Sequence, residues 1–77
     1  MIEQHIVYRY LWSDEVRHIV AHRVDDVVTC SDLDNELHLG DYVLDGDTLS
    51  GPGDLTENQR QGVAAELRRC EPVVWQS

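Results

Sequence analysis

Two histidines and two cysteines are the residues of this sequence whose types best suit metal chemistry. His18 and His22 are four positions apart, a spacing that places both on the same face of a helix or of a strand. Together with Cys30, Cys70 or His38 they would complete a tetrahedral zinc site. However, the chain contains no Cys-x-x-Cys pair, and these ligands would come from separate segments. We therefore predict no metal site and expect the histidines to be exposed or partly buried.

The cysteines Cys30 and Cys70 would stabilise a small fold if they formed a disulfide, because the bond would close a long loop. The first residues, Met-Ile-Glu-Gln-His, do not resemble a secretory leader, and no apolar run approaches the ~18 residues of a membrane span. We therefore expect a cytoplasmic location, in which thiols stay reduced, and favour two free buried cysteines over the disulfide.

Residues 32–36 (Asp-Leu-Asp-Asn-Glu) superficially resemble the start of a calcium-binding loop. Leu37 stands where such a loop requires glycine and Val43 where it requires glutamate, which excludes an EF-hand. No serine lies in a Gly-x-Ser-x-Gly motif, and the Gly-Pro-Gly segment at 51–53 lacks the lysine of a phosphate-binding loop. A chain this short also has little room for a water-excluding cleft, so we predict that it is not an enzyme and uses no cofactor.

Charge restricts the function more than any motif does. The chain has 15 acidic and 6 basic residues and a formal net charge of −9. This charge would repel a nucleic-acid backbone or an anionic membrane, so direct binding to either is not expected. Residues 24–59 contain no arginine or lysine and hold ten of the acids, namely Asp25, Asp26, Asp32, Asp34, Glu36, Asp41, Asp45, Asp47, Asp54 and Glu57.

Part of this acidic block is predicted to form a row of carboxylates. If residues 32–36 are extended, Asp32, Asp34 and Glu36 lie on one side of a strand at a repeat of ~6.6 Å. Such a row would compete with nucleic acid for the arginines and lysines of a groove built for phosphates. The residues that we predict to bind a partner are Asp25, Asp26, Asp32, Asp34, Glu36, Asp41, Asp45 and Asp47.

In size and charge the chain is similar to immunity proteins of nuclease toxins and to phage-encoded inhibitors of bacterial defence systems, including many anti-CRISPR proteins. This similarity implies a non-enzymatic inhibitor that occupies the basic nucleic-acid-binding surface of a protein or nucleoprotein complex. The alternative is a small structural or regulatory domain whose acidity is a coat for solubility or high salt. In this alternative, two copies of the domain could pair through their sheet edges to form a homodimer.

The elements that must position these residues begin with a strand over residues 5–12, which are rich in β-branched and aromatic side chains. Residues 16–30 are ambiguous. Their valines recur at helical spacing, but most of the apolar residues are β-branched and also alternate as in a strand. We favour strands, with Ser13, Asp14 and Glu15 as a hairpin turn.

The later half of the chain carries clearer local signals. Asp45-Gly46 is typical of a tight hairpin turn between strands at 36–44 and 47–50. Thr56 and Gln59 fit a capping box at the start of a helix that runs to about Cys70. Pro72 would end this helix, and residues 73–75 (Val-Val-Trp) would add an edge strand.

Together these elements predict one α+β domain over residues 1–77, in which a small antiparallel sheet of three to five strands carries the C-terminal helix on one face. A helix over residues 14–28 would instead give the order βαββαβ, similar to that of ferredoxin-like domains. The chain has no phenylalanine, and its tyrosines and tryptophans are Tyr8, Tyr10, Trp12, Tyr42 and Trp75. We expect most of these five side chains to lie in the core.

Overall fold

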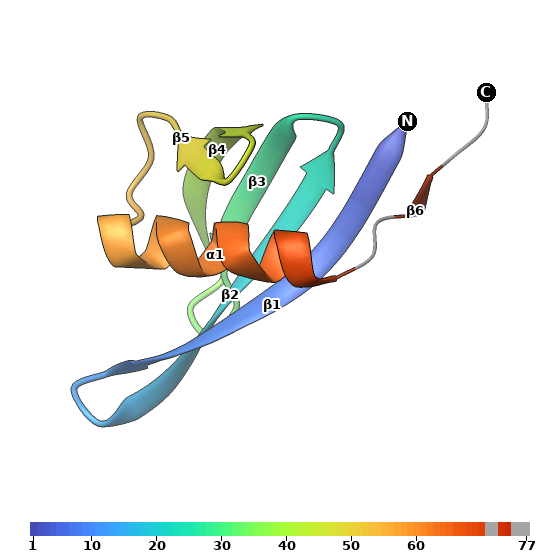
Figure 1. The fold of residues 1–77 in the computed structure, drawn as a ribbon. Coiled ribbons are helices and arrows are strands. Elements are labelled where there is room, and N and C mark those ends of the chain that lie inside the picture. The colour runs from blue at the N-terminus through green and yellow to red at the C-terminus, as the bar shows by residue number, and fades with distance from the viewer. Residues whose placement is uncertain (71–72, 75–77) are drawn as a thin grey trace.

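The strands of the sheet follow one another in space in nearly the same order as in the chain. The computed structural model describes residues 1–70 and 73–74. Its sheet has the order β5-β4-β3-β2-β1-β6, and every neighbouring pair is antiparallel (Figure 1). The elements are β1 (Ile2–Trp12), β2 (Glu15–Val24), β3 (Val27–Asp32), β4 (Leu37–Asp45), β5 (Thr48–Ser50), α1 (Glu57–Arg69) and β6 (Val73–Val74).

The ambiguous segment is strand rather than helix. β1 and β2 form a long hairpin in which Trp12 pairs with Glu15 across a two-residue turn. The turn residues Ser13 and Asp14 have φ angles of 50° and 67°, the left-handed region that a tight hairpin turn requires. The preference for strands over residues 16–30 is therefore confirmed, and the ferredoxin-like order, which needs a helix there, is wrong.

The β4–β5 hairpin is present, but its turn lies one residue further along than predicted. Asp45 pairs with Thr48, so Gly46 and Asp47 form the turn. Gly46 has a φ of 59°, which glycine adopts without steric cost. Asp45 therefore ends β4, and Asp47 lies in the turn rather than beginning β5.

Helix α1 begins at the predicted capping box. The Thr56 hydroxyl accepts a hydrogen bond from the Gln59 backbone nitrogen at 3.2 Å, and the Gln59 side-chain oxygen accepts one from the Thr56 nitrogen at 3.0 Å. Val63, Ala64 and Leu67 are the buried residues of the helix. They share one hydrophobic cluster with Ile6, Ile19, Ala21, Val28, Cys30 and Tyr42 of the sheet.

The side chain of Tyr42 fixes the connection between sheet and helix. It is 1 % exposed, and its hydroxyl donates to the Leu39 carbonyl at 3.0 Å while accepting from the Leu55 nitrogen at 2.9 Å. Gly53 must be glycine, because a β-carbon there would overlap the Tyr42 hydroxyl. This contact determines how the loop after β5 returns across the sheet to start α1.

The predicted aromatic core is only partly correct. Tyr42 is buried, and Tyr8 and Tyr10 are partly buried against the core. Trp12, however, is 52 % exposed, because the tip of the β1–β2 hairpin extends beyond the helix as an arm (Figure 1). Trp75 lies outside the described residues.

The number of strands is larger than predicted. Five strands form a continuous meander, and β6 adds a sixth, two-residue strand through the pairs Ile2–Val74 and Glu3–Val73. The predicted edge strand is therefore confirmed for residues 73–74. Within the described residues, the only helix, α1, has 13 residues, and no helix has the length and apolar character needed to span a bilayer.

Candidate functional site

The acidic block of the sequence becomes an acidic side of the sheet. β3, β4 and β5 lie next to one another and come from the segment without arginine or lysine. The arginines of the sheet, Arg9, Arg17 and Arg23, are all on β1 and β2. Because the meander keeps chain order as spatial order, charge is segregated across the sheet as well as along the chain.

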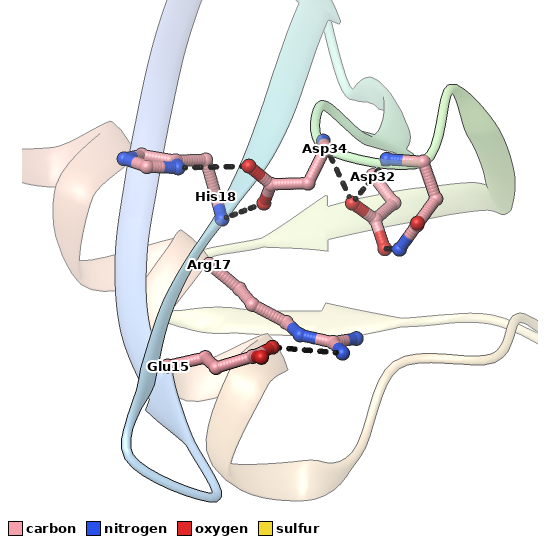
Figure 2. A network of polar contacts seen from close by, with 6 residues as sticks. Glu15, Arg17, His18, Asp32 and Asp34 are labelled. Atoms are coloured by element: carbon pink, nitrogen blue, oxygen red, sulfur yellow. Dashed lines mark hydrogen bonds and ion pairs between the residues drawn. The ribbon is translucent and has the colours of Figure 1, made fainter.

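The predicted row of Asp32, Asp34 and Glu36 does not form, because residues 33–36 make a turn rather than an extended strand. Asp32 is 7 % exposed, and its carboxylate accepts hydrogen bonds from the Asp34 nitrogen at 2.9 Å, the Asn35 nitrogen at 3.2 Å and the Asn35 side-chain nitrogen at 3.1 Å (Figure 2). The Asn35 side-chain hydrogen bond is the main reason that the pKa of Asp32 is lowered. Asp32 therefore supports the turn and is not available to a partner.

Asp34 lies on the surface and connects this turn to β2. Its carboxylate accepts a hydrogen bond from the His18 backbone nitrogen at 2.8 Å and lies 3.4 Å from the His18 ring nitrogen Nδ1 (Figure 2). Glu36, at the end of the turn, is exposed and has a φ of 54°. These two acids flank the start of β4.

The other end of β4 lies beside a second acidic turn. The Leu44 nitrogen donates to the Asp26 carbonyl oxygen at 2.8 Å, so the β2–β3 turn lies next to the end of β4. The Asp25 carboxylate accepts a hydrogen bond from the Ile2 nitrogen at 3.0 Å. Asp47 forms a 2.8 Å ion pair with Arg68, a contact between two exposed side chains.

Six of the eight predicted acids thus surround β4 with exposed side chains. Asp41 lies in the middle of β4, Asp45 ends it, and the others occupy the turns beside its two ends. We call this set the acidic margin; it consists of Asp26, Asp34, Glu36, Asp41, Asp45 and Asp47. Asp32 is left out because it is buried, and Asp25 because its carboxylate is bonded to the Ile2 nitrogen of β1, away from β4.

The zinc sets considered from the sequence are not assembled. His18 and His22 do share a face, but Cys30 pairs with Ala21 and therefore lies on the opposite, helix-covered face. Cys30 and Cys70 are both free, Cys30 buried and Cys70 partly so. Burial raises the pKa of the Cys30 thiol to about 11, which keeps it protonated and a poor metal ligand.

A different cluster, missed from the sequence, occupies the face opposite the helix. His5 pairs directly with His22 across β1 and β2, and Glu3 is two residues before His5 on the same face. The Glu3 carboxylate lies 2.8 Å from His22 Nε2 and 3.6 Å from His5 Nε2. A signal was available: a two-residue turn at Ser13 and Asp14 fixes a register that places residues 5 and 22 opposite each other.

A hollow with a volume of about 530 Å³ lies between the arm and the start of α1. Its described lining is aromatic and amide-bearing and includes Tyr8, Tyr10, Trp12, Asn58 and Gln59, but no histidine or carboxylate. Its Thr56 hydroxyl is already used as the helix cap.

No family model, curated protein or solved structure matches this chain.

Proposed function

We propose that the chain is a non-enzymatic binding protein whose acidic margin occupies the basic, nucleic-acid-binding surface of a partner. The observation that carries this proposal is the segregation of charge: β3, β4 and β5 hold no arginine or lysine, and the exposed acids gather around β4. A surface of one sign attracts a partner of the opposite sign and discourages others.

The acidic margin extends along the whole length of β4. β4 has nine residues, which at ~3.3 Å per residue corresponds to a length of roughly 30 Å. Acids stand at its start, middle and end, with Asp41 and Asp45 on the strand itself. Carboxylates distributed over this length would meet several of the lysines and arginines that otherwise contact phosphates.

Rigid placement adds to the proposal. The Asp26 turn is bonded to the backbone of β4, and the Asp34 turn is bonded to β2. Charges fixed on a sheet lose little freedom when a partner binds, so more of the electrostatic attraction appears as affinity. These features support an inhibitor of a nucleic-acid-handling protein, for which we retain the expected cytoplasmic location as part of the proposal.

The experiment is an affinity capture from host lysate, with the captured proteins identified by mass spectrometry. We expect a basic nucleic-acid-binding protein that is released by salt and by an excess of the nucleic acid it binds. The capture is repeated with Asp41→Asn/Asp45→Asn, which removes two charges from the margin. The matched control, Asp14→Asn/Glu15→Gln, removes two charges from the tip of the arm.

The proposal requires the margin variant to lose the partner while the arm variant retains it. Equal capture by both variants would contradict the role of the acidic margin. Capture of a protein that does not bind nucleic acid, or that nucleic acid does not displace, would contradict the class of partner.

A further inference from the structure

Three metal-binding side chains converge on the face of the sheet that the helix does not cover. The ligand atoms of Glu3, His5 and His22 all lie within 4.8 Å of one another. The two imidazole rings stack with centroids 4.1 Å apart and planes inclined by 12°. Both Nε2 atoms lie on the side of the Glu3 carboxylate, at 2.8 and 3.6 Å from the same oxygen.

We propose that Glu3, His5 and His22 bind a divalent transition-metal ion, with Zn²⁺ as the ion that best fits the ligands. Two imidazoles and one carboxylate form a donor set that zinc uses when it keeps a fourth position for water. The site is independent of the acidic margin, which lies around β4, whereas these ligands are on β1 and β2.

The geometry requires only a local adjustment. Zinc binds nitrogen and oxygen ligands at about 2.0–2.2 Å, so two ligand atoms of a tetrahedral site lie roughly 3.4 Å apart. The two distances from the Glu3 oxygen, 2.8 and 3.6 Å, are already close to that, and all three ligand atoms lie within 4.8 Å of one another. The two rings must turn from their stacked orientation until both Nε2 lone pairs point to one ion. His5 is 65 % exposed and His22 40 % exposed, so both rings have solvent beside them into which to turn.

The backbone holds the ligands in place. His5 and His22 form the third pair of a ten-pair antiparallel ladder, and Glu3, on the same strand as His5, belongs to its first pair. A ladder of this length fixes the positions of all three α-carbons without the metal. Imidazole nitrogen favours zinc and its neighbours in the first transition series over Mg²⁺ and Ca²⁺, which prefer oxygen ligands.

The test uses the untagged full chain, stripped of metal with a chelator and titrated with Zn²⁺ in a calorimeter. We expect one ion per chain, and His5→Ala and His22→Ala each to weaken binding by at least about tenfold. The matched control is His38→Ala, because His38 is also an exposed histidine next to a carboxylate, 3.7 Å from that of Asp41. It should bind as the wild-type chain does.

Two further measurements keep the result independent of folding defects and of thiols. In the wild-type chain, Zn²⁺ should shift the imidazole NMR signals of His5 and His22 and leave those of His38 in place. Cys70→Ser should bind zinc unchanged. The proposal is overturned if His5→Ala and His22→Ala still bind as the wild type does, if the NMR shifts occur elsewhere, or if Cys70→Ser abolishes binding.

Discussion

The backbone nitrogen of Leu44 donates a hydrogen bond to the carbonyl oxygen of Asp26 at 2.8 Å. This hydrogen bond extends the pairing of β3 with β4 into the β2–β3 turn. It therefore holds two acidic segments, the β2–β3 turn and the end of β4, next to each other on one surface. Asp26 and Asp45 are both exposed there, and residues 24–59 supply no arginine or lysine to separate them. Like charges held together in this way repel each other.

The first prediction concerns stability at low salt. Asp41→Asn/Asp45→Asn should raise the free energy of unfolding by roughly 0.5–1 kcal/mol at low ionic strength, because it relieves repulsion in the acidic margin. Salt screens the same repulsion, so the gain should shrink at high ionic strength. Urea unfolding of the wild type and the variant at two salt concentrations measures this. A variant less stable than the wild type would show that these acids do not repel one another in the fold.

The second prediction concerns the Tyr42 hydroxyl. Tyr42→Phe should lower the free energy of unfolding by about 1–3 kcal/mol, because the Leu55 nitrogen and the Leu39 carbonyl lose their buried partner. Gly53→Ala should cost at least as much, since its β-carbon would overlap the same hydroxyl. Chemical denaturation measures both variants. Wild-type stability in Tyr42→Phe would mean that the hydroxyl does not hold the loop.

The third prediction concerns acid stability. The Asn35 hydrogen bond lowers the pKa of Asp32, so the ionised carboxylate stabilises the fold above its unfolded pKa of about 3.9. That contribution is lost as the pH falls through the lower, folded pKa. Asp32→Ala should therefore lower the free energy of unfolding at pH 7 by about 1–3 kcal/mol. The difference from the wild type should narrow as the pH falls below about 4. A difference that is independent of pH would contradict the role of the charge.

The fourth prediction concerns the two thiols. Burial raises the pKa of Cys30 to about 11, so this thiol should stay protonated and resist iodoacetamide at pH 8 in the folded chain. Cys70 is only partly buried and should be alkylated first. Mass spectrometry of the alkylated protein, with a urea-unfolded sample as control, distinguishes the two sites. Rapid labelling of Cys30 in the folded chain would contradict its burial.

Much of the fold could be predicted because the local signals were strong. The capping box of Thr56 and Gln59 and the turn around Gly46 each depend on neighbouring residues, and both are present. The one-residue shift of that turn reflects cross-strand pairing, which sequence spacing does not determine. Residues 16–30 are ambiguous in sequence because their valines recur at helical spacing and also alternate. The pairing of β1 with β2 across the Ser13-Asp14 turn, and of β2 with β3, makes them strands.

The candidate site was harder to predict, because it depends on register and on local hydrogen bonds. Asp32 was expected on a surface row, but its carboxylate accepts three hydrogen bonds within its own turn and is buried. To predict the cluster of Glu3, His5 and His22, one must know the register of the β1–β2 hairpin, and the sequence left open whether residues 16–30 form a strand or a helix. The acidic surface was easier to predict. Neighbouring strands of a meander are also neighbours in the chain, so a block of acids in the sequence lies together on the sheet.

The measurement that tests the central claim most directly is the association rate of the captured partner as a function of salt. For the wild-type chain this rate should fall steeply as ionic strength rises. Asp41→Asn/Asp45→Asn should lower the rate at low salt by about 2- to 10-fold and flatten its salt dependence, while Asp14→Asn/Glu15→Gln should change neither. If the margin variant associates as fast as the wild type at every salt concentration, the acidic margin is not the binding surface.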